Sequence, residues 1–118
     1  MMAAADLRVP LKVDVIRDRG SMVRDVEDGE LENVYRLQIM NATEVPRRYR
    51  IRAEGVEGLR VASGDEVALE AADTRGFPVR LRAPRAVLAN GSHAIRFHVE
   101  AADDAALRVE EKSVFIVR

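Results

Sequence analysis

The sequence predicts an all-β fold, an antiparallel β-sandwich of seven or eight short strands. Two observations support this prediction. Apolar and polar residues alternate with a period of two in run after run, which is typical of strands with one buried face. Turn-forming residues separate the runs at intervals of roughly 8–15 residues, and no stretch keeps a helical period over a useful length.

The first part of the chain contains five such runs. A polar loop over 25–32, turning at Asp28-Gly29, separates the first run from the second. Asn41 ends the second run, and Gly55 and Gly58 interrupt the chain after the third. The predicted strands cover residues 11–15, 35–40, 48–53, 59–61 and 67–69.

Three further strands are predicted, over 77–82, 93–100 and 107–117. Pro78 lies inside the first of them and indicates an edge strand or a bulge, because proline cannot donate a ladder hydrogen bond. Asn90-Gly91 is a strong turn signal. The last strand is apolar on both faces at its end, which favours a more central position. A single helical turn within 65–72 or 103–107 is the remaining alternative to strand and loop.

Composition excludes several classes of protein. The chain has 118 residues, a net charge of −1 and no cysteine. It therefore contains no disulfide, thiol nucleophile or thiolate-held cluster, and it lacks the basic excess that nucleic-acid binding needs. No apolar run approaches the ~18 residues of a membrane helix. Residues 1–7 lack the features of a signal peptide and are expected to be a disordered start, followed by one domain over 8–118.

The candidate metal ligands are poorly arranged. His93 and His98 lie five apart on one predicted strand, so their side chains point to opposite faces. Met22 and Met40 are possible copper ligands by chemistry, but they lie in separate segments. We expect these residues to be structural or solvated, and no metal site is predicted.

Three other patterns have a chemical interpretation and a simpler structural one. The acidic run 25–32 lacks the ligand spacing of a calcium loop and is expected to be a solvated hairpin loop. Gly91-Ser92-His93 places a hydroxyl beside an imidazole, but neighbouring strand residues point apart, so a turn before a strand is favoured. Gly55-Val56-Glu57-Gly58 lacks the third glycine and the helix of a dinucleotide site. No catalytic residue, cofactor site or small-molecule substrate is predicted.

The basic stripe Arg48, Arg50 and Arg52 is the strongest candidate for a contact face. Alternate residues of a strand share one face, so the three guanidinium groups project together, with Arg47 beside them. Arginine suits carboxylates and phosphates, including lipid head groups. The alternative is a solvated outer face that is neutralised by acidic residues on a neighbouring strand.

Five segments of the chain are distinctive, at residues 8–19, 31–41, 48–50, 91–97 and 111–115. In this order they resemble the C-terminal immunoglobulin-like domain of the FixG/CcoG family. The resemblance extends from about Leu7 to the end of the chain, and its segments are structural and not catalytic.

The resemblance implies a membrane-bound parent protein. Family members are bacterial inner-membrane proteins with cysteine-bound [4Fe–4S] clusters that serve the biogenesis of cbb-type cytochrome c oxidase, with a proposed role in copper reduction. The C-terminal domain follows the last membrane helix and is expected in the periplasm. This chain has no cysteine, so no cofactor and no redox residue of the family carries over to it.

We therefore expect a non-catalytic accessory domain that acts by contact. Its expected partners are the membrane portion of the parent protein, oxidase subunits, other assembly factors or the membrane surface. An independent adhesion or ligand-binding sandwich is the first alternative, although aromatic residues make up only 4% and tryptophan is absent. A periplasmic copper-binding domain is the second alternative.

Overall fold

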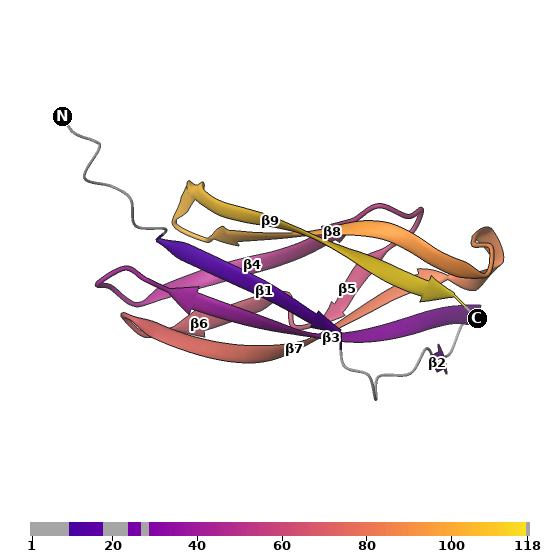
Figure 1. Ribbon diagram of the computed structural model, residues 1–118, viewed down its shortest axis with the longest axis horizontal. Coiled ribbons are helices and arrows are strands. Elements are labelled where there is room, and N and C mark those ends of the chain that lie inside the picture. The colour runs from indigo at the N-terminus through magenta and orange to yellow at the C-terminus, as the bar shows by residue number, and fades with distance from the viewer. Residues whose placement is uncertain (1–9, 18–23, 27–28, 118) are drawn as a thin grey trace.

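The predicted strands form two antiparallel sheets that pack face to face (Figure 1). This architecture is seen in a computed structural model, which describes residues 10–17, 24–26 and 29–117. The all-β sandwich predicted from the sequence is confirmed, with eight main strands and one strand of three residues in those ranges. The expected start over 1–7 lies outside the described residues.

The two sheets contain strands from distant parts of the chain. Sheet A has the spatial order β1 (Leu11–Arg17), β3 (Glu30–Asn41), β7 (Asp73–Pro84), β5 (Arg60–Ser63), and the short β2 (Arg24–Val26) also pairs with β3. Sheet B has the order β6 (Glu66–Leu69), β4 (Arg47–Glu54), β8 (Gly91–Ala101), β9 (Asp104–Val117). A 3-10 turn, η3 (Arg85–Val87), follows β7.

Alternate residues of the long strands fill the space between the sheets. On β3 these include Tyr35 and Leu37, which are 1% and 0% exposed. Phe97 on β8 faces Tyr35 from sheet B, and the two ring centroids lie 5.1 Å apart at an interplanar angle of 72°. This edge-to-face geometry suits the quadrupoles of the two rings. The prediction that Leu37 and Phe97 are buried in opposite sheets is confirmed.

The chain crosses from sheet A to sheet B between β5 and β6. Gly64 occupies the crossing with φ +87°, and a Cβ there would lie 2.6 Å from the carbonyl oxygen of Pro78. Only glycine fits this position. The β5 register ends at Ser63 opposite Arg80, so Pro78 has no partner in β5. β7 is thus an inner strand with a local free edge at its proline, and the bulge lies in β5, just before Ser63.

The predicted polar loop over 25–32 is largely strand. β2 and β3 form a hairpin in which Val26 lies opposite Glu30, and β3 begins five residues before the predicted strand at Tyr35. Glu30 and Glu32 fit into strand structure because their carboxylates pair with Arg60 and Arg82 across the sheet. Residues 27 and 28 of the predicted loop lie outside the described residues.

The helical turn considered within 65–72 or 103–107 is not formed. Those residues belong to β6, to two turns and to β9. Helical geometry occurs instead just after Pro84, where the proline ends β7 and η3 begins. No helix in the described ranges is long and apolar enough to cross a membrane.

The prediction that the last strand is central is wrong, because β9 is the edge of sheet B. Side chains of β3 reach across the sandwich to its free edge. The amide of Asn33 donates to the carbonyl of Ile116 (3.1 Å) and accepts from its backbone N–H (2.9 Å). The Tyr35 hydroxyl donates to the carbonyl of Val114 (2.6 Å). We call these three hydrogen bonds the clasp. The end of β9 is therefore apolar on both faces because this edge strand of sheet B also lies against β1 and β3 of sheet A.

Leu37→Ala should lower the free energy of unfolding by about 2–5 kcal/mol, because it removes a fully buried side chain and leaves a cavity. Gln38→Ala should change it by less than ~0.5 kcal/mol, because Gln38 points outward across Gly76 and contributes nothing to the core. Urea denaturation of both variants measures the difference. Equal losses would contradict the register of β3.

Two tyrosine variants test the clasp with a matched control. Tyr35 and Tyr49 are 1% and 0% exposed, and replacement by Phe removes the same atom from each. Tyr35→Phe should lower the free energy of unfolding by about 1–3 kcal/mol, because the carbonyl of Val114 loses its donor. Tyr49→Phe should leave it unchanged or higher, because that hydroxyl has no hydrogen-bond partner among the described residues. Equal losses in urea would show that the clasp adds nothing.

The Tyr49→Phe variant should also change how stability depends on pH in the alkaline range. Burial raises the pKa of Tyr49 above its ordinary value of 10.0. The unfolded chain therefore loses this proton more readily, and stability falls as the pH rises from about 10 toward the raised pKa. Tyr49→Phe should make this alkaline loss less steep, as melting curves across that pH range would measure.

Candidate contact surface

The outer face of sheet B carries the predicted basic stripe. Tyr49 and Ile51 of β4 point into the core, so the alternate residues Arg48, Arg50 and Arg52 point outward, and all three are exposed. They lie on one strand near the middle of the sheet, between β6 and β8. The structure thus brings together the three residues that the sequence singled out.

Acidic residues on the neighbouring strands offset part of this charge. Glu66 on β6 lies 3.6 Å from Arg48 and 4.0 Å from Arg50. Glu100 on β8 is the cross-strand partner of Arg50 on the other side. Because these groups are solvent-exposed, each ion pair contributes only about 0–1 kcal/mol, and an external anion can compete for the arginines.

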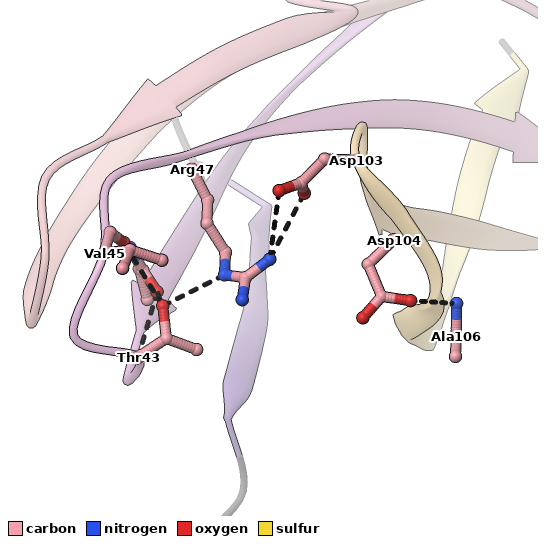
Figure 2. A network of polar contacts seen from close by, with 7 residues as sticks. Thr43, Val45, Arg47, Asp103, Asp104 and Ala106 are labelled. Carbon is pink, nitrogen blue, oxygen red and sulfur yellow. Dashed lines mark hydrogen bonds and ion pairs between the residues drawn. The ribbon is translucent and has the colours of Figure 1, made fainter.

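Arg47 is separate from the stripe and holds one end of the sandwich together (Figure 2). Its Nε donates to Oγ1 of Thr43 (3.1 Å), and its Nη1 lies 3.2 Å from Oδ1 of Asp103 in the turn between β8 and β9. The side chain is only 19% exposed. Arg47 therefore joins two loops that are far apart in the sequence and is not available as a contact residue.

The loop between β3 and β4 is fixed by side-chain hydrogen bonds. The Asn41 amide donates to the carbonyls of Val45 (2.9 Å) and Glu70 (3.0 Å) and accepts from the backbone N–H of Thr43 (3.0 Å). Asn41 itself is fully buried, whereas the side chain of Val45 is 48% exposed. This end of the sandwich thus presents an apolar side chain on a rigid loop.

The two histidines do not share a site. His93 lies on the inward-facing register of β8 and its Nε2 lies 2.7 Å from the carbonyl oxygen of Ala89. His98 lies on the outer face, where its Nε2 is 2.8 Å from Oε2 of Glu54. In the described ranges no three His, Cys, Asp or Glu side chains are placed to hold a metal. Met40 is half-buried on β3, and Met22 lies outside the described residues.

Within the acidic run, residues 25, 26 and 30–32 belong to the two strands of the β2–β3 hairpin in sheet A. Glu30 forms a two-pronged ion pair with Arg60 on β5. Oε2 of Glu32, a residue that is 0% exposed, accepts from Nε of Arg82 at 2.9 Å. The hydrogen bonds from Arg60 hold the pKa of Glu30 below its ordinary value. These glutamates are therefore structural partners of arginines, which the spacing along the chain did not reveal.

The remaining sequence candidates are structural. Ser92 and His93 are neighbours in β8, so their side chains leave opposite faces of the strand. Gly55 and Gly58 lie in the turn between β4 and β5, each with positive φ. The described residues thus bring together no nucleophile, base and oxyanion hole. A groove of about 490 Å³ lies beside Gly55 on the outer face of sheet B.

The fold defines a class of protein, an antiparallel β-sandwich domain of two packed sheets. Residues 1–118 match the family model described as "IG-like fold at C-terminal of FixG, putative oxidoreductase". The chain belongs to this family of FixG C-terminal immunoglobulin-like domains, and the resemblance found in its sequence segments is confirmed.

A solved relative has the same fold. The crystal structure of a FixG-related protein from Vibrio parahaemolyticus is 26% identical with a TM-score of 0.81, and the match covers 92% of this chain and 97% of that chain. A protein from Archaeoglobus fulgidus is 22% identical with a TM-score of 0.47, covering 91% of this chain and 96% of that chain. The second likeness is too low to support an argument. No curated protein matches the chain.

The geometry of the histidines predicts weak metal binding. After dialysis, the full chain should bind Cu²⁺ no more tightly than micromolar, because opposed histidines cannot share an ion. A titration followed by calorimetry and metal analysis measures this. The matched variants His93→Gln and His98→Gln should leave the weak binding nearly unchanged. A stoichiometric site of nanomolar affinity would contradict our interpretation of these residues.

Proposed function

We propose that the chain is a non-catalytic accessory domain of a membrane-bound iron–sulfur protein that takes part in the assembly of a cbb-type cytochrome c oxidase. In this proposal the domain lies on the periplasmic side of the inner membrane and carries no cofactor of its own. It acts by contact with the membrane surface beside its anchor, and through that contact it orients the parent protein toward the oxidase. Membership of the FixG C-terminal family is the observation that carries the proposal.

The end at which the chain enters the sandwich supports a contact with the membrane. Leu11 pairs with Asn41, and the backbone N–H of Ala42 donates to the carbonyl of Pro10 (3.0 Å), so β1 begins beside the rigid loop that exposes Val45. The start of β1 lies at the same end of the sandwich as the connection from β3 to β4 (Figure 1). A preceding anchor would hold this end closest to the bilayer. Arg48, the first residue of the stripe, lies on β4 just beyond the same loop.

The chemistry of this end suits an anionic bilayer surface. An exposed valine can enter the interfacial region, and the arginines of the stripe can pair with phosphate head groups. Each arginine near such a surface contributes roughly 1 kcal/mol, and the effect fades beyond a Debye length of ~8 Å at physiological salt. Among the described residues, the only ion pairs of the stripe are the weak ones that Arg48 and Arg50 form with Glu66, and lipid head groups can replace them.

Replacing Arg48, Arg50 and Arg52 by Ser should leave folding intact and weaken association with anionic vesicles. Three lost contacts of roughly 1 kcal/mol each predict a loss of about 100-fold in partition coefficient at low salt. Co-sedimentation with vesicles of phosphatidylglycerol and phosphatidylcholine, at low and high salt, measures this. A melting curve of the same variant checks the fold.

The matched control replaces Arg36, Arg75 and Arg80 by Ser, three exposed arginines of sheet A. This control removes the same charge from the other sheet and should reduce vesicle binding much less. If both triple variants lose binding equally, net charge and not the stripe explains the association. If the wild-type chain shows no salt-sensitive binding, the membrane contact should be abandoned.

A further inference from the structure

The clasp shows which residue pairs of the β8–β9 ladder are hydrogen-bonded to each other and which are not. In an antiparallel pair, residues alternate between those that bond across the ladder and those that direct N–H and C=O away from it. Ile116 directs both groups outward to Asn33, so its pairing with Ser92 is a non-hydrogen-bonded pair. Every second pair along this ladder, up to the bulge at Glu100, shares this close geometry, with Cα atoms about 4.5 Å apart.

In two of these close pairs a basic side chain lies opposite an acidic one, and a third pair departs from this arrangement. Glu100 lies opposite Arg108, and His98 lies opposite Glu110, with Nδ1 of the histidine 4.0 Å from the carboxylate. The next close pair is Arg96 opposite Lys112, two cations on exposed positions. Like charges directly opposite each other destabilise a sheet, so this pair works against the fold in the free chain.

The carboxylate opposite Arg96 on β4 is bonded to another residue. Glu54 on β4 is the cross-strand partner of Arg96, but its Oε2 bonds His98 at 2.8 Å. Among the described residues, neither Arg96 nor Lys112 has a carboxylate within ion-pair distance. The two cations are therefore close together and uncompensated at one end of the outer face.

Both cations line the groove of about 490 Å³ beside Gly55. The floor includes Ala94 and Ile95, of which Ile95 is only 2% exposed, and Glu54 and Ser113 add polar groups to the lining. Gly55 has φ +133°, and a Cβ there would lie 2.6 Å from the carbonyl oxygen of Ala94, so no side chain can cover the floor at this point. The groove thus combines a cationic rim with a lining that is partly apolar and partly polar.

We propose that this groove binds the carboxylate of an acidic side chain from an extended segment of a partner protein, with Arg96 and Lys112 as its two cationic contacts. Glu54 also lines the groove, but its carboxylate bonds His98, so both cations are left for a single carboxylate of the partner. A phosphate dianion would bring a second negative charge close to Glu54. The bound carboxylate also relieves the repulsion between the two cations. This inference concerns the end of sheet B opposite Val45 and is independent of the proposed membrane contact.

The premise of repulsion is tested without a ligand. Lys112→Gln should raise the melting temperature at low salt, because it removes a like-charge pair. Arg108→Gln, on the same strand and face, should lower it, because it breaks an opposite-charge pair with Glu100. Both shifts should shrink at ~1 M salt, where the Debye length falls to about 3 Å. If Lys112→Gln lowers the melting temperature as Arg108→Gln does, the premise is wrong and the proposal falls with it.

Binding is tested on the full chain with a capped five-residue peptide, Gly-Val-Glu-Val-Gly, and its glutamine counterpart. Chemical-shift titration at low salt should show shifts around Arg96, Lys112 and Ser113 with the glutamate peptide, and weaker binding of the glutamine peptide. Arg96→Gln combined with Lys112→Gln should weaken glutamate-peptide binding about fivefold or more, whereas Arg108→Gln should change it less than twofold. Equal binding of the two peptides, no binding at millimolar peptide, an equal loss in Arg108→Gln, or tighter binding of inorganic phosphate would each overturn the proposal.

Discussion

The clasp between β3 and the free edge of β9 determines how the two sheets meet. Asn33 presents one donor and one acceptor to the backbone of Ile116, as a neighbouring strand would. Tyr35 adds a third hydrogen bond at Val114 and also packs its ring edge-to-face with Phe97. One stretch of β3 thus bonds the free backbone groups of an edge strand in the other sheet and also fills the core. Each hydrogen bond contributes only about 1 kcal/mol, so its main effect is to select one alignment of the sheets.

That alignment decides which charges become neighbours on the surface. With the clasp in place, the even-numbered residues of β9 direct their backbone outward, and their side chains lie close to those of β8. Glu110 then lies near His98, and Arg108 lies opposite Glu100, whereas Lys112 meets Arg96. A shift of one residue would reverse the faces of the whole strand. The surface chemistry therefore depends on hydrogen bonds made in the interior.

Sequence reasoning succeeds where one strand carries its own signal. The alternation around Tyr35 and around Tyr49 identifies the buried faces, and the arginines between the buried residues of β4 are correctly assigned to the outer face. It fails where the signal lies in another strand. Glu32 has a charged side chain, which predicts exposure, but it is fully buried beside Arg82. The apolar end of β9 is explained by its contact with Asn33 on β3, which the β9 sequence does not reveal. The resemblance to a family supplied the fold type but no pairing of side chains.

The need to know the neighbouring strand also distinguishes the two candidate contact regions, the arginine stripe of β4 and the pair of cations across β8 and β9. Arg48 and Arg50 were visible in the sequence because they lie on one strand at a spacing of two, yet Glu66 already compensates part of their charge. Arg96 and Lys112 are 16 positions apart and gave no signal, yet the ladder places them opposite each other without a carboxylate of their own. The charge of the arginine row on β4 is partly balanced by a carboxylate on the neighbouring strand β6. A like-charge pair across two strands has a cost in the free chain, and a ligand that removes this cost gains affinity from it.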